Sequence, residues 1–103
     1  MTRLGQAIEE LDADVALATA REMGYVSLYD ALRLCRMLAR AGDPRYERAA
    51  VRWMLRLKSE TDASLPELEL AAAGLGVLAR APESEKAWDV LAGLVKARGQ
   101  GSG

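Results

Sequence analysis

The sequence predicts an all-α protein, folded as a compact antiparallel bundle of five to six short helices. Apolar residues recur at helical spacing along most of the chain, and several Ser and Asp residues stand where helices begin. No stretch alternates β-branched with polar residues over the length of a strand. The helices are expected at about 3–11, 13–23, 28–41, 44–60, 65–80 and 83–97. Their short connections make neighbouring helices antiparallel.

The first 24 residues could form one helix or two. A single apolar stripe runs through the segment, formed by Leu4, Ile8, Leu11, Val15 and Ala18. Residues 12–14 (Asp-Ala-Asp) are nevertheless typical of a cap that starts a second helix, so we expect a break there. Gly24 is expected to end that second helix.

Capping chemistry predicts three later helix starts. Ser27 and Ser64 each precede a helix and have a carboxylate three residues further on. Asp43 is expected to cap the helix at 44–60, with Pro44 at its first position, where a missing N–H costs nothing. Within the helix at 65–80, residues 71–76 (AAAGLG) lack the strand and lysine of a phosphate-binding loop. Their small side chains predict a close helix crossing or a local kink.

The 103 residues are expected to form one domain over 1–97, because half are hydrophobic and 28% are charged. Residues 98–103 are expected to be a disordered tail, and their Gly-Ser-Gly end resembles an added linker. No apolar run approaches the roughly 20 residues of a membrane span, and the N-terminal segment lacks the apolar stretch of a secretory signal. We therefore expect a cytoplasmic protein that binds no membrane.

The composition excludes most familiar catalytic and metal sites. The chain has no histidine and one cysteine, Cys35, so it can form no Ser-His-Asp triad, Cys-His pair, Cys cluster or His-based zinc site. Cys35 lies in the middle of an apolar stripe and is expected to be an inert core residue. We expect no enzymatic activity, no catalytic residues, no cofactor and no metal.

Arginines gather on the outer faces of two predicted helices. In the helix at 28–41, they are Arg33, Arg36 and Arg40, with Tyr29 on the same side. In the helix at 44–60 they form one row of Arg45, Arg48, Arg52 and Arg56, with Val51 and Leu55 beside the row and away from Trp53. A helix with apolar residues on two sides is either central in its bundle or carries a binding patch. Trp53 and Trp88 are both expected to anchor the core, because ligand stacking would need exposed rings.

Charge is segregated along the chain, with net values of −4 for residues 1–32, +6 for 33–58 and −3 for 59–103. One interpretation is an anion-binding surface for nucleic acid, a phosphorylated ligand or an acidic helix. The other is that the acidic helices fold back and pair with the arginines in surface salt bridges worth about 0–1 kcal/mol each. We favour the second, because charged stripes are ordinary on bundle helices.

Two resemblances bear on these predictions. Residues 45–53, preceded by 25–28 and 30–32, resemble a group of small all-helical proteins from high-GC actinobacteria, which implies a helical fold but no activity. Residues 8–12 and 43–45 are similar to the all-helical chorismate mutases, which use arginines and a lysine and need no histidine.

The chorismate mutase resemblance is a remote alternative. The N-terminal segment holds only Arg3 and Arg21, no lysine occurs before Lys58, and the arginine rows lie outside the predicted core faces.

The leading hypothesis is therefore a non-enzymatic module that binds another protein or a second copy of itself. The alternative is binding of an anion or nucleic acid by the arginine rows. The candidate surface for either comprises Arg33, Arg36, Arg40, Arg45, Arg48, Arg52, Arg56, Val51 and Leu55.

Overall fold

The computed structural model describes residues 3–9 and 12–99. Its elements are α1 (Arg3–Glu9), α2 (Ala13–Met23), α3 (Leu28–Arg40), α4 (Tyr46–Glu60), α5 (Leu65–Arg80), α6 (Glu85–Leu94) and a π-helical turn, η1 (Val95–Gly99). No strand occurs within the two described ranges, which confirms the all-α prediction. None of the described helices is long and apolar enough to cross a membrane.

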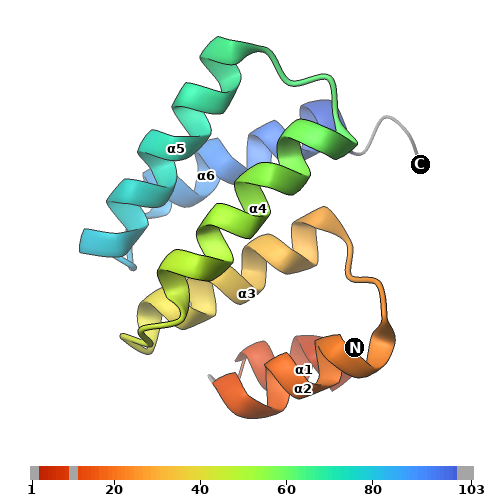
Figure 1. Cartoon of the computed structure of the whole chain (residues 1–103). Coiled ribbons are helices and arrows are strands. Elements are labelled where there is room, and N and C mark those ends of the chain that lie inside the picture. The colour runs from red at the N-terminus through yellow and green to blue at the C-terminus, as the bar shows by residue number, and fades with distance from the viewer. Residues whose placement is uncertain (1–2, 10–11, 100–103) are drawn as a thin grey trace.

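The helices surround α3, which packs against α1, α2, α4, α5, α6 and η1. The α1–α2 pair lies at one end of the molecule and α5 at the other, and α4 runs between α3 and α5 in the direction opposite to α5 (Figure 1). The radius of gyration is 12.8 Å, close to the roughly 13 Å of a compact chain of 100 residues.

Burial explains why α3 takes the central place. Its buried side chains are Leu28, Leu32, Leu34, Cys35, Met37, Leu38 and Ala39. Leu34 and Met37 extend the apolar stripe predicted for this helix around most of its circumference. Helix α4 has apolar residues on two sides, but only one side is buried, with Tyr46, Ala50, Trp53 and Leu57. The sequence allowed two explanations for these two apolar sides, a central place in the bundle or a binding patch. The structure shows that α4 is not the central helix.

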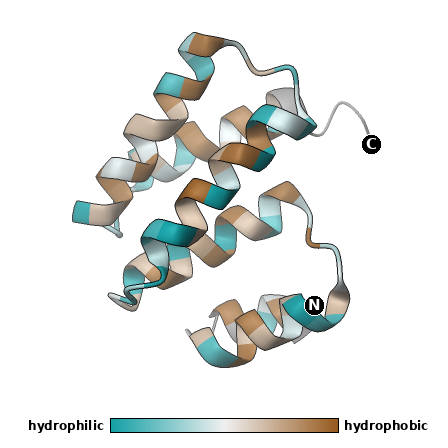
Figure 2. Ribbon diagram, viewed as in Figure 1, coloured by the Kyte–Doolittle hydropathy of each residue, from teal (hydrophilic) through white to brown (hydrophobic). Residues whose placement is uncertain are grey.

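Hydrophobic and hydrophilic residues alternate around the helices, and the outward face of α4 carries both kinds (Figure 2). The core is one cluster that runs from Leu4 and Ile8 of α1 to Leu94 and Val95. Gly74 of α5 faces the buried Leu91 of α6, and a β-carbon at Gly74 would lie 3.1 Å from Leu91 Cγ. This contact confirms that a small residue in segment 71–76 permits a close helix crossing.

Side-chain caps begin most of the helices. Asp12 accepts a hydrogen bond from the Val15 amide, which confirms the break after the first helix. Ser27 caps α3, Ser84 caps α6, and Ser64 caps α5 in a full reciprocal capping box. The end predicted for the first helix, residues 10–11, lies outside the described residues.

The predicted start of the fourth helix is wrong by two residues. The Asp43 carboxylate accepts a hydrogen bond from the Arg45 amide, and the Tyr46 amide bonds to the Asp43 carbonyl. Residues 43–45 therefore form a turn, and the helix begins at Tyr46. The preceding turn closes α3, with Gly42 at a φ of 63° and its amide bonded to the Ala39 carbonyl. Gly24 ends α2, as predicted, and also has a positive φ, of 78°.

The last helix also differs from its prediction of 83–97. Ser84 accepts a hydrogen bond from the Ala87 amide, so the helix begins at Glu85. After Leu94 the backbone widens into η1, which includes Arg98 and Gly99 of the predicted tail. The disorder predicted for 98–103 stays a prediction, and 100–103 lie outside the described residues.

Candidate interaction surface

Most arginines of the two predicted rows are engaged by the fold itself. On α3, Arg33 pairs with Asp30 at 3.4 Å, and Arg40 Nε lies 3.3 Å from Glu83 Oε1 in the turn before α6. The acidic C-terminal part of the chain thus supplies a counterion to the basic middle. This agrees with the interpretation of the charge segregation as salt bridging.

Arg36 makes a different contact, because its guanidinium carbon lies 3.8 Å from the centroid of the Trp88 ring. The Tyr29 ring stands 5.9 Å from the same indole. Desolvation is the main cause that lowers the pKa of Arg36, and the nearby positive charge of Arg40 lowers it further. The guanidinium remains charged at neutral pH, since arginine starts from a pKa far above that range.

Trp88 packs against the core, as predicted, but it is only half-buried, because its other face lies under a cation. The indole contacts the core on one side and meets Arg36 on the other. No local pattern in the sequence predicts this, because Arg36 and Trp88 lie on different helices and come together only when α3 and α6 pack.

Arg45 ties the corner between α3 and α4 to α2. Its Nη2 lies 2.6 Å from Asp43 Oδ2 and 3.1 Å from Asp14 Oδ1. The hydrogen bonds from the Arg45 side chain and backbone lower the pKa of Asp43 to about 2. Hydrogen bonding to Asp43 raises the pKa of Arg45 in turn. This residue precedes α4 and does not belong to a continuous row on that helix.

Arg56 turns away from the predicted row toward the segment between α2 and α3. Its Nε donates to Glu60 at 2.7 Å, and its Nη2 donates to the Val26 carbonyl at 2.7 Å. The guanidinium also lies 5.4 Å from the Tyr25 ring centroid. The hydrogen bond to Glu60 raises the pKa of Arg56. These contacts make Arg56 part of the fold.

Arg48 and Arg52 are the two arginines of the predicted rows for which the structure shows no such contact in the described residues. Both are exposed, and neither makes an ion pair within residues 3–9 and 12–99. Val51 and Leu55 stand beside them with 60% and 62% of their surfaces exposed. We call these four residues the α4 surface. It lies on the side of α4 opposite Trp53, which is 1% exposed.

Helical geometry explains why these four side chains gather. Val51 and Leu55 are four residues apart, as are Arg48 and Arg52, so each pair lies along one side of the helix. The apolar row and the basic row run next to each other. Glu47 and Lys58, both exposed, border the apolar row on its other side.

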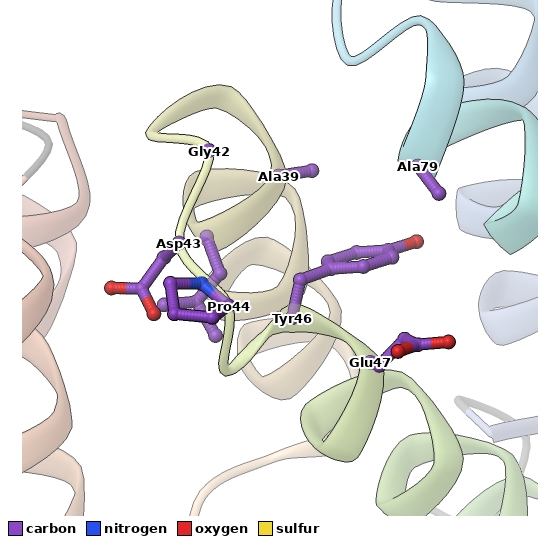
Figure 3. Close-up of a pocket in the computed structure, with 8 residues that line it drawn as sticks. Ala39, Gly42, Asp43, Pro44, Tyr46, Glu47 and Ala79 are labelled. Atoms are coloured by element: carbon purple, nitrogen blue, oxygen red, sulfur yellow. The ribbon is translucent and has the colours of Figure 1, made fainter.

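A pocket of about 240 Å³ lies at the corner between α3 and α4 (Figure 3). The Tyr46 ring points from the start of α4 toward Ala79 of α5, while the Asp43 carboxylate points away from both. The Tyr46 hydroxyl donates to the Leu75 carbonyl at 2.6 Å, and burial raises the Tyr46 pKa to about 12. The Tyr46 hydroxyl and the Asp43 carboxylate are thus engaged in the fold, and we assign the pocket no ligand.

A second hollow, an apolar groove of about 210 Å³, lies between α5 and α6. It is lined by Leu70, Ala73, Gly74, Val77, Ser84, Lys86, Ala87 and Val90. Leu70 and Val77 are seven residues apart and so share one side of α5, but the groove exists only because α6 supplies the second wall.

The chain's thiol and carboxylates form no reactive cluster in the described residues. Cys35 is buried, and burial raises the pKa of its thiol to about 12, in keeping with an inert core residue. Within the same residues, no group of three or more Cys, Asp or Glu could hold a metal ion.

Comparisons of the chain with protein-family models, with curated proteins and with solved structures found no match. The two resemblances drawn from the sequence therefore stay predictions. The geometry of the α4 surface has to carry the functional argument by itself.

Proposed function

We propose that this chain is a non-enzymatic helical interaction module that binds another protein, or a second copy of itself, through the α4 surface. The observation that carries the proposal is the exposure of Val51 and Leu55 in the middle of a helix whose opposite side is fully used in the core. Scattered exposed apolar residues are ordinary, but these two lie in one row.

The neighbouring arginines add to the argument. Protein interfaces are enriched in arginine, whose long apolar stem and charged head can contact both kinds of partner group. Arg48 and Arg52 have no counterion in the described part of the chain, whereas Arg33, Arg40, Arg45 and Arg56 each have one. A carboxylate of a partner would give Arg48 and Arg52 the counterion that the other four arginines have within the fold.

Binding is also better supported than catalysis by the state of the ionisable groups. The only thiol is buried and protonated at neutral pH, and five of the seven candidate arginines are engaged in salt bridges or over Trp88. We propose a cytoplasmic location on the sequence grounds given above.

The nucleic-acid alternative has less support from the geometry. Only two of the seven candidate arginines are exposed without a described partner, so few phosphates could be neutralised. Affinity for nucleic acid falls with salt by a slope set by that number. A titration with duplex DNA and with single-stranded RNA at two salt concentrations tests this alternative, and a steep slope would favour it over a protein partner.

Site-specific photo-cross-linking tests the proposed function. A photoreactive amino acid in place of Leu55 should give a discrete adduct in whole-cell extract or with a second copy. The same residue in place of Val15, which is 49% exposed on α2, is the matched control. An adduct from position 55 but not from position 15, lost when Arg48 and Arg52 are replaced by glutamate, supports the proposal. Absence of any adduct from position 55, in a chain that sediments as a monomer, contradicts it.

A further inference from the structure

The α4 surface has two rows of different chemistry, and this restricts what can cover it. Each row consists of two side chains four residues apart on a helix that rises 1.5 Å per residue, so its members stand about 6 Å apart along the axis. The apolar row of Val51 and Leu55 runs beside the basic row of Arg48 and Arg52. A complementary partner must present an apolar row and an acidic row next to each other, with the same spacing.

A helix meets this requirement and an extended segment does not. Successive side chains of a strand point to opposite faces, so an extended peptide directs a single row toward the surface it lies on. Side chains of a helix at i and i+4, together with those at i+3 and i+7, form two neighbouring rows on one face. The two-row pattern therefore favours an amphipathic helix as the occupant.

Charge decides between a second copy and a different protein. With the bordering Glu47 and Lys58, the surface holds one acidic and three basic side chains, a net charge of +2. A two-fold dimer would place this patch against itself, because such an interface uses the same surface on both subunits. Two patches of the same sign repel each other, whereas an acidic partner is attracted and oriented.

We infer that the α4 surface binds an amphipathic helix of a partner protein in which carboxylates, one turn apart, flank an apolar row. This inference rests on the proposed function and names the chemistry of its partner. The Leu55 and Val51 side chains contact the apolar row of that helix. Arg48 and Arg52 then pair with its carboxylates.

The experiment uses two synthetic helical peptides and the full chain labelled with ¹⁵N. The first peptide has leucines one turn apart and glutamates in the adjacent row, and the second has lysines in place of the glutamates. A third peptide has the composition of the first, but its leucines and glutamates alternate. This pattern has the two-residue period of a strand instead of the period of a helix. Binding is located and quantified by amide chemical shifts, and sedimentation measures self-association of the chain alone.

The inference predicts that the glutamate helix shifts the amides around residues 48–55 and that the other two peptides bind at least about tenfold more weakly. Replacing Arg48 and Arg52 by glutamate should reverse the preference in favour of the lysine peptide. The neutral pair Arg48→Gln and Arg52→Gln should abolish the preference, and it serves as a second variant if the first folds poorly. Arg21→Glu with Arg80→Glu, which makes the same charge change outside the α4 surface, should leave the preference unchanged.

Three results would overturn the inference. The first is equal binding of the glutamate and lysine helices, or no binding of either. The second is a set of shifts centred on the α5–α6 groove. The third is a dimer of the chain that Leu55→Ser dissociates, which would identify a second copy as the occupant. If any of these results were found together with an adduct from position 55 in the cross-linking experiment, the proposed function would still hold. Only the inference that the partner is an acidic amphipathic helix would be contradicted.

Discussion

Trp53 shows how one residue can connect elements that are remote in sequence. Its side chain is 1% exposed, and its indole Nε1 donates a hydrogen bond to the Leu28 carbonyl at 2.9 Å. That carbonyl belongs to the first residue of α3, so the indole fixes α4 against the start of the central helix. Trp88, half-buried beneath Arg36, has no comparable role in the interior.

Trp53→Ala should reduce the free energy of unfolding by roughly 3–5 kcal/mol, because it leaves a cavity and removes the indole's hydrogen bond to the Leu28 carbonyl. Trp88→Ala should reduce it by clearly less, since part of that ring already faces solvent. Urea titration followed by circular dichroism measures both losses. An equal loss for the two variants would contradict the environments assigned to them.

Asp43 makes the stability of the corner between α3 and α4 dependent on pH. Arg45 lowers the folded-state pKa of Asp43 to about 2, below the roughly 3.9 of an unfolded chain. A group with a depressed folded pKa stabilises the fold above its unfolded pKa, and this contribution disappears as pH falls through the folded value. Asp43→Asn should therefore lower the melting temperature at pH 7, and the difference from the parent should shrink between about pH 4 and pH 2. Calorimetry of the parent and the variant over that pH range measures the difference in melting temperature. A difference that does not change with pH would contradict the prediction.

At the scale of the element, α5 contains two glycines in different surroundings. A β-carbon at Gly74 would lie 3.1 Å from Leu91 Cγ and 3.2 Å from Leu91 Cδ2, whereas at Gly76 the nearest atom would be Arg80 Nη1 at 4.0 Å. Leu91 is buried, and its Cγ is not the free end of a flexible side chain. The Leu91 side chain therefore has little room to move away from an added β-carbon.

Gly76→Ala should stabilise the protein by up to about 1 kcal/mol through helix propensity alone. Gly74→Ala gains the same propensity but crowds Leu91, and overpacking of this kind costs about 1–3 kcal/mol, so the net effect should be destabilising. Thermal melts of the two variants make a matched comparison. Stabilisation by Gly74→Ala would show that α5 and α6 pack less closely than described.

On α4, the arginines of the predicted row divide into two classes. Arg56→Glu should reduce the free energy of unfolding by roughly 1 kcal/mol or more, because it removes the donor to the Val26 carbonyl and places two carboxylates four residues apart. Arg48→Glu and Arg52→Glu should each change it by no more than about 0.5 kcal/mol, as exposed positions do. Chemical denaturation separates the two classes. A large loss for Arg52→Glu would show that the α4 surface is part of the fold.

At the scale of the whole molecule, burial is distributed unevenly between the two ends. α3 buries seven side chains and contacts every other element, while α2 buries only Ala16 and Thr19. The α1–α2 pair joins the rest through α3 and through the exposed ion pair of Asp14 with Arg45.

Native-state hydrogen exchange should therefore show α2 opening at a lower free energy than α3. Helices with few buried contacts exchange by local opening, whereas those at the centre of the core exchange only on global unfolding. Measurement of amide exchange with increasing denaturant resolves the two levels. Equal opening free energies for α2 and α3 would show instead that the molecule unfolds as one cooperative unit.

The sequence alone determined the helices, their caps and their faces. Ser27, Ser64 and Asp12 cap helices as predicted, Gly24 ends one, and Trp53 and Cys35 lie in the core. Val51 and Leu55 lie on the outward face, as the sequence placed them. These features depend on helical periodicity and on hydrogen bonds over three or four residues, which a linear pattern records.

Only the tertiary structure decided that Arg36, Arg40 and Arg45 make contacts between helices and that Arg48 and Arg52 make no ion pair within the described residues. Arg45 meets Asp14, Arg40 meets Glu83 and Arg36 meets Trp88, and each pair joins residues from separate parts of the chain. Periodicity gives the direction of a side chain around its own helix but carries no information about which helix lies opposite. For this reason the sequence predicted one basic row on α4, and the packing of α2, α3 and α6 reduced the candidates to Arg48 and Arg52.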